Sequence, residues 1–162
     1  MLDRAGSCRA ALCGALLALA VSAAAGAPST TDQDAIFARK TLKDTICDKL
    51  AEIERMIARG DIDRGGVHRQ ADAIAVLLLA FPHLFPPGSN QWKPNADAPP
   101  ETVTLASPEV WTSFADFYRQ AEAAAKSADA LAHATTADDV KSHARELRIA
   151  CDTCHALYLE DQ

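Results

Sequence analysis

Apolar residues recur every three or four positions along four stretches of the chain, which is the spacing of one face of an α-helix. Thr31 and Asp34 have the spacing of a capping pair at a helix start, and Gly60 is suited to end that helix. A second stripe runs from near Asp63 to Phe81, where a cluster of prolines stops it. The apolar positions of the first stripe are Leu42, Ile46, Leu50, Ile53 and Ile57.

The second and third stripes are separated by a connection of about 25 residues that holds seven of the eight prolines. Ser107 and Pro108 predict the start of a third helix, which no later glycine or proline interrupts. Thr136 and Asp139 form a second capping pair, and the helix after them carries Val140, Ala144, Leu147, Cys151, Cys154 and Tyr158 on one seam. The pattern shows no strand-like alternation, so we expect an all-α four-helix bundle with a long Pro-rich loop between helices two and three.

The first residues of the chain read as a targeting segment. Arg4 and Arg9 precede an uncharged run over residues 10–25, which ends in the small residues of an Ala-x-Ala pattern. The run is shorter than the roughly 20 residues of a membrane span. We therefore predict that residues 1–27 are a signal peptide cut near 25–27, which leaves residues 28–162 as a periplasmic protein without a membrane anchor. A retained single-helix anchor is the alternative.

Composition narrows the class of partner and of cysteine chemistry. The 162 residues carry a formal net charge of −6, so nucleic acid, whose phosphates need a basic face, is not an expected partner. Five cysteines are an awkward number for a set of disulfides. Two of them fall in the predicted leader, and the remaining three are Cys47, Cys151 and Cys154.

Residues 151–155 read Cys-Asp-Thr-Cys-His, the motif that attaches a c-type haem. On a helix, residues three apart project from the same side, so the thiols of Cys151 and Cys154 can both reach the vinyl groups of one porphyrin. The adjacent His155 can then bind the iron as proximal ligand. Two alternatives remain: a redox-active disulfide, and a zinc site that also uses Cys47 and a histidine.

With this motif near the end of a four-helix pattern, the sequence resembles the class II cytochromes c, that is, the cytochrome c-prime family and its low-spin relatives. Arg39, the segment 85–89, the segment 108–111 and Tyr158 match the family as well. The resemblance covers about residues 32–158.

The resemblance implies a left-handed antiparallel bundle with one haem c, and its iron, per chain. It implies that Cys151 and Cys154 form the thioether bonds, that His155 is the proximal iron ligand and that Arg39 lies near the haem propionates. It further implies that two copies associate through the first two helices, as many members do.

The distal side departs from the family pattern. Low-spin members have a methionine four residues after the helix-one arginine, where this chain has Lys43. Met56, the methionine that remains after the leader is removed, lies roughly 20 Å further along the helix. Three readings stay open: Lys43 binds the iron, Lys43 lies near the haem without binding it, or helix one sits in another register.

Other residues near the motif have simpler readings. Cys47 is expected to be a small buried side chain, with a distal thiolate or an intermolecular disulfide as alternatives. His83 is the histidine least excluded as a distal ligand, whereas His68, His133 and His143 are expected at the surface or at helix ends. Leu159 stands where relatives carry Arg or Lys after the tyrosine, which removes a cation from the proximal side.

These observations favour a non-enzymatic periplasmic monohaem cytochrome that carries one electron between redox partner proteins. A five-coordinate haem module that binds NO or CO is the alternative, and a dithiol oxidoreductase without haem is the third hypothesis. A haem held rigidly in a bundle suits electron transfer, and Lys43 near the iron counts modestly against an open position for a gas.

Overall fold

The computed structural model describes residues 30–91 and 104–160, and in them it contains long helices with no named strand. The predicted signal peptide and its cleavage site therefore lie outside the described residues, as does the middle of the Pro-rich loop. The four long helices are α1 (Thr30–Arg59), α2 (Arg64–Ala80), α4 (Phe114–Ala132) and α5 (Ala137–Tyr158). The short ones are η1 (Phe81–Leu84), η2 (Pro87–Ser89) and α3 (Glu109–Thr112).

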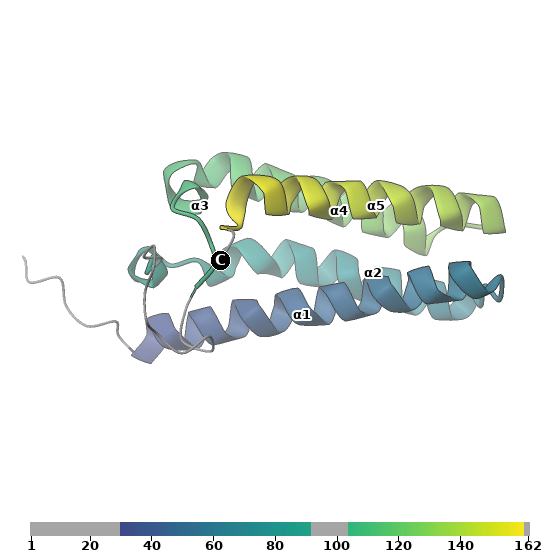
Figure 1. Cartoon of the computed structure of the whole chain (residues 1–162), viewed down its shortest axis with the longest axis horizontal. Helices are drawn as coiled ribbons and strands as arrows, with labels where there is room; N and C mark the ends of the chain where they lie inside the picture. Colours follow the sequence, from purple (N-terminus) through teal and green to yellow (C-terminus); the bar gives the residue numbers. More distant parts are fainter. Residues whose placement is uncertain (1–29, 92–103, 161–162) are drawn as a thin grey trace, which may run out of the picture.

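The long helices run alternately up and down the bundle, with α1 beside α2 and α4 beside α5 (Figure 1). Helix α2 also packs on α4, so the apolar stripes of all four long helices enclose one core. The core centre is formed by fully buried aliphatic side chains, among them Leu50, Ile53, Ile74, Leu131 and Leu147. The prediction of an all-α four-helix bundle is confirmed; its left-handed twist stays a prediction.

Most of the predicted helix ends are confirmed by local geometry. Gly60 has φ 71°, the left-handed conformation that glycine adopts without a steric penalty, and it ends the last turn of α1. The Asp63 side chain accepts a hydrogen bond from the Gly65 amide at the start of α2. Thr136 and Asp139 form the expected reciprocal capping box of α5.

The third predicted helix is not continuous. It divides into α3 and α4 at Ser113, whose φ of −124° and ψ of 37° are not helical. Trp111 explains the division, because its indole Nε1 donates to the carbonyl oxygens of Phe85 and Pro86, each at 3.2 Å. Those bonds and the burial of Val110 hold α3 against the loop, so α4 restarts in a new direction.

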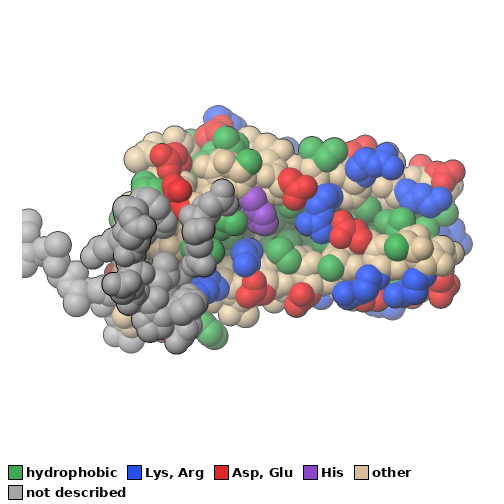
Figure 2. Space-filling model, viewed as in Figure 1, with side chains coloured by type: hydrophobic (Ala, Val, Ile, Leu, Met, Phe, Trp, Pro, Cys, Tyr) green, Lys and Arg blue, Asp and Glu red, His purple; other side chains and the backbone are tan. Residues whose placement is uncertain are grey.

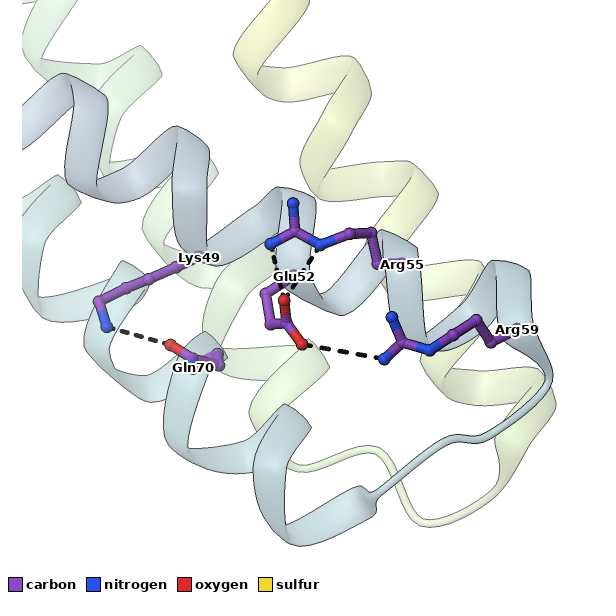
Figure 3. A network of polar contacts seen from close by, with 5 residues as sticks. All are labelled: Lys49, Glu52, Arg55, Arg59 and Gln70. Atoms are coloured by element: carbon purple, nitrogen blue, oxygen red, sulfur yellow. Dashed lines mark hydrogen bonds and ion pairs between the residues drawn. The ribbon is translucent and has the colours of Figure 1, made fainter.

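The charged segment at the far end of α1 forms a solvated face, as its composition predicts. Glu52 accepts hydrogen bonds from Arg55, the shorter at 2.6 Å, and lies 3.9 Å from Arg59 (Figure 3). One turn earlier, Lys49 Nζ donates to Gln70 Oε1 of α2 at 3.0 Å. Among the described residues, no helix combines the length and the apolar character needed to cross a membrane.

Candidate functional site

A cavity opens between α1 and α5 near the end of the bundle that holds the loops. It contains about 1120 Å³ of empty space, part of which is open to solvent. Figure 2 shows the hollow on this face: hydrophobic side chains form its floor, and a histidine and Lys or Arg side chains lie at its edges. The apolar walls come from α1, α2, α4 and the loop, with Ile46, Leu50, Leu78, Phe85, Phe117 and Ala124 among them.

The last turns of α5 bring the whole predicted motif to this cavity. Cys151, Cys154 and His155 all line it, because the helix is unbroken from Ala137 to Tyr158. Both cysteines are free thiols of intermediate exposure. The three residues therefore line one space, as the helical spacing predicts, and their roles toward a haem stay predictions.

The protonation of these groups follows from burial. Burial raises the pKa of the Cys151 thiol to about 11 and that of the Cys154 thiol to about 11. Burial, and next the neighbouring Lys43 ammonium, lower the pKa of His155, which favours the neutral imidazole that binds metals. A catalytic dithiol needs a lowered thiol pKa and usually lies at a helix start. Here both thiol pKa values are raised and both cysteines lie near the C-terminal end of α5, which disfavours the dithiol alternative.

The zinc alternative lacks ligands. Zinc sites in proteins use three or four His, Cys or acidic side chains around one point. Among the residues that the structure describes, no group of three such side chains converges on a metal position. Cys47 does line the cavity, yet it adds no such group with Cys151 and His155.

Lys43 of α1 lines the same cavity as the Cys151–His155 motif of α5. Its side chain is 42 % exposed and its ammonium lies 2.9 Å from the Asp44 carboxylate. The same ammonium contributes to the lowered pKa of His155, so the two residues share one electrostatic environment. This position fits the register that places Lys43 on the distal side.

Arg39 lies one turn before Lys43 and is buried, with 4 % of its surface exposed. Its guanidinium lines the cavity and donates to Ser89 and Thr104, and burial lowers its pKa to about 10. These partners could not be predicted from the sequence, because they lie 50 and 65 residues away from Arg39 along the chain.

Sequence reasoning missed an ion pair beside the cavity. Arg148 of α5 makes two parallel hydrogen bonds of 2.8 Å with the carboxylate of Glu54 in α1. Arg148 lines the cavity next to Cys151, whose charge interaction with it opposes the rise in the thiol pKa. The weak signal for this pair is that Glu54 and Arg148 each lie beside a core position of their stripe.

The remaining histidines lie elsewhere. His83 is exposed and stacks edge-on against Tyr118, and it does not line the cavity, so the structure gives no support to a distal role for it. His68 and His133 contact each other and backbone carbonyls at the far end of α2 and α4. His143 lies 3.0 Å from Glu146, on the surface of α5.

Comparison with known proteins gives consistent results. A family model described as Cytochrome C' matches residues 34–158. Cytochrome c-556 of Agrobacterium tumefaciens (strain II Chrys) is 31 % identical over 98 residues, which are 59 % of this chain and 71 % of that protein. The crystal structure of cytochrome c' from Thermochromatium tepidum is 23 % identical, with a TM-score of 0.70 over 83 % of this chain and 100 % of the other.

A further structure, of a cytochrome c' with an unusual ligand-controlled dimer dissociation, is 20 % identical. Its TM-score is 0.69 over 80 % of this chain and 97 % of that chain. Fold and family match together define a class II c-type cytochrome. The chain belongs to the cytochrome c' family.

Members of this family are haem-binding cytochromes that carry electrons or bind ligands, and they are typically non-catalytic. Their cofactor is covalently attached haem c with its iron, and this chain takes the same cofactor. The cavity fits such a group: two thiols and a neutral imidazole lie on one wall, and the other walls are apolar. Arg39, Lys40, Lys43 and Arg148 place positive charge at the cavity, and the described lining residues include no carboxylate.

Proposed function

We propose that the protein is a periplasmic monohaem c-type cytochrome that carries one electron between redox partner proteins and catalyses no reaction of its own. The observation that carries the proposal is the convergence of Cys151, Cys154 and His155 on one apolar cavity. When bound there, haem c supplies a one-electron Fe(III)/Fe(II) couple.

The residues of the chain have separate roles in this proposal. Cys151 and Cys154 would hold the cofactor through thioether bonds, and His155 would bind its iron as proximal ligand. Arg39 is a proposed partner of the propionates. Its buried guanidinium makes its described hydrogen bonds to neutral oxygen atoms, so these bonds give it no negative partner. The apolar walls would reduce the amount of water around the iron, which limits rearrangement of its surroundings on oxidation and reduction.

Lys43 is the proposed distal residue. Its amine can bind iron only when it is neutral and its ion pair with Asp44 is open. Lys43→Ala tests this: if the amine is a ligand, the variant loses the low-spin visible spectrum of the wild-type protein. A low-spin spectrum that Lys43→Ala leaves unchanged shows that Lys43 is a neighbour of the haem and not a ligand.

A five-coordinate module that binds NO or CO is the second candidate. The apolar distal wall made by Ile46, Leu50 and Ala124 favours it, because small diatomic ligands enter apolar pockets readily. Addition of CO to the ferrous protein decides between the two. A spectrum that does not change with CO removes the gas-binding function.

Export and assembly complete the proposal. The segment 1–27 would direct the chain to the periplasm, where haem attachment takes place. We propose that two copies associate through α1 and α2, on which Phe37, Val76 and Leu79 are exposed to solvent. Sedimentation of Phe37→Ser against the matched α5 variant Ile149→Ser tests this, since only the first should shift a dimer toward monomer.

Electron transfer itself is tested by redox titration of the purified holoprotein. The proposal predicts a reversible one-electron couple, with about 59 mV for each tenfold change in the oxidised-to-reduced ratio. A haem that cannot be reduced and reoxidised reversibly would contradict it.

A further inference from the structure

One buried side chain from α1 holds the two ends of the long loop together. Arg39 Nη1 donates to Ser89 Oγ at 2.7 Å, and Nη2 donates to Ser89 O at 3.0 Å and to Thr104 Oγ1 at 2.6 Å. Ser89 lies in the first part of the loop and Thr104 in its last part, and each is at most 2 % exposed. Arg39 therefore supplies hydrogen bonds to both ends in a place that water does not reach. Each end also has a local bond, from Ser89 Oγ to the Pro86 carbonyl and from the Ala106 amide to Thr104 Oγ1.

The guanidinium is also held in orientation by aromatic rings. Its central carbon lies 4.7 Å from the ring centre of Phe85 and 5.5 Å from that of Trp111. Trp111 in turn donates to the Phe85 carbonyl, so the rings and the loop backbone form one packed unit. Arginine can stack its planar guanidinium on aromatic rings and donate to several acceptors at once, and lysine cannot do this.

The loop end at Thr104 continues into a contact with the end of α5. The Ser107 amide donates to the Tyr158 carbonyl at 2.9 Å, and the Glu160 amide donates to the Leu105 carbonyl at 2.8 Å. Ala106 and Leu159 form an antiparallel bridge between the same two segments. We call residues 84–89, 104–107 and 158–160 the collar, because they surround one end of the cavity.

The collar continues directly into the helical turn that carries His155. The Leu159 amide donates to the His155 carbonyl at 3.0 Å, and Tyr158 lies three residues after His155 on α5. A contact sequence thus runs from Arg39 through Thr104 and Ser107 to the turn of His155.

We propose that Arg39 is a positioning residue: by joining Ser89 to Thr104 it fixes the collar, and through the collar it sets the position of the His155 turn. The proposal rests on the proposed role of His155 as iron ligand. It assigns Arg39 a function through its fork of hydrogen bonds, in addition to any contact of its charge with propionates.

Variants that remove the fork without removing the charge, or that remove only an acceptor, separate the two functions. Arg39→Lys keeps the charge, and Thr104→Val keeps the shape of the acceptor side chain but deletes its hydroxyl. Arg55→Lys is the matched control, because Arg55 makes an exposed ion pair on the same helix (Figure 3). All are made in the full-length holoprotein.

The first readout is hydrogen exchange of the backbone amides of Ser107 and Glu160. Neither residue has a described hydrogen bond to Arg39, so a change there reports on the collar. We expect exchange at both amides to become about tenfold faster in Arg39→Lys and in Thr104→Val, and to stay unchanged in Arg55→Lys. The second readout is the reduction potential, which should shift in the same direction in both collar variants.

Wild-type exchange rates in Thr104→Val would overturn the proposal. A potential that shifts in Arg39→Lys alone would overturn it as well, since that result would show that Arg39 acts by its own contact with the haem and not through the collar. If Arg39→Lys fails to fold, Thr104→Val and Ser89→Ala decide the matter, because each deletes one hydroxyl only. Exchange is measured on the backbone whether or not His155 binds iron. Failure of the collar and failure of the electron-transfer function are therefore distinguishable.

Discussion

Lys43 on α1 and His155 on α5 line the same cavity, and the Lys43 ammonium contributes to the lowered pKa of the His155 imidazole. The two residues are 112 positions apart in the chain, and the bundle places them on facing helices. The two residues therefore lie at one cavity, which is the arrangement that the proposed distal role of Lys43 requires.

The placement of residue 43 leads to the first prediction. Lys43→Met puts a neutral thioether on the distal side, and we expect it to bind the iron together with His155, giving a low-spin spectrum and a raised reduction potential. Thr41→Met, at an exposed position of the same helix, is the control and should leave the spectrum unchanged. Identical spectra for Lys43→Met and Thr41→Met would show that residue 43 does not face the iron.

The second prediction concerns Tyr158, whose hydroxyl donates to the Asp116 carboxylate at 2.8 Å. Tyr158→Phe should lower the free energy of unfolding, because the Asp116 carboxylate loses a donor, and the loss should be modest because Arg119 and solvent still reach that carboxylate. Chemical denaturation of the holoprotein measures this, with Tyr118→Phe as the control.

The same tyrosine predicts a dependence on pH. Burial, and next the hydrogen bond to Asp116, raise the pKa of Tyr158 from 10.0 to about 12. Tyr158 therefore ionises at lower pH in the unfolded state than in the folded state. Its contribution to the stability of the folded protein is complete below pH 10 and is lost as the pH rises toward 12. This loss should be absent in Tyr158→Phe; an equal loss in both proteins would assign it to other groups.

The ion pair between Glu54 and Arg148 gives the third prediction. Glu54→Gln removes the charged acceptor of a bidentate pair that joins α1 to α5. Both side chains are partly solvated, so we expect a loss of about 1 kcal/mol in the free energy of unfolding. Glu52→Gln, whose partner Arg55 is on the same helix, should cost measurably less than Glu54→Gln. Equal losses would mean that the pair does not join the helices energetically.

The end of α1 gives the fourth prediction. Gly60→Ala should destabilise the protein by about 1 kcal/mol, because its φ of 71° is costly for a residue with a Cβ even though no neighbour would contact that atom. Gly65→Ala, inside the first turn of α2, should leave the midpoint of thermal unfolding unchanged or raise it. A Gly60→Ala protein as stable as the wild type would show that the turn adopts another conformation.

Local features of this protein were predictable from the sequence, and long-range side-chain contacts were not. The helix seam that carries Cys151 and Cys154, the capping box at Thr136 and the turn at Gly60 each depend on residues a few positions apart. The fork of Arg39 and the pair of Arg148 with Glu54 join residues 50 to 94 positions apart, so no spacing rule reveals them.

The third predicted helix shows the same limit. Its apolar spacing continues without interruption through Ser113, yet Trp111 is held by carbonyl oxygens of a loop 25 residues earlier. A tertiary contact therefore overrides the local preference for one continuous helix. Lys43 was predicted to lie on the distal side from its position relative to Arg39; it lines the cavity, and its role toward the iron stays a prediction.

The central claim is that Cys151 and Cys154 hold one haem covalently in this cavity. The most direct test is the mass and visible spectrum of the protein after extraction with acidified organic solvent, which removes haem that is not covalently bound. The account predicts a polypeptide that retains its Soret band and the mass of one haem, and a Cys151→Ala/Cys154→Ala variant that loses both. A colourless wild-type polypeptide with two free thiols at these positions would contradict it.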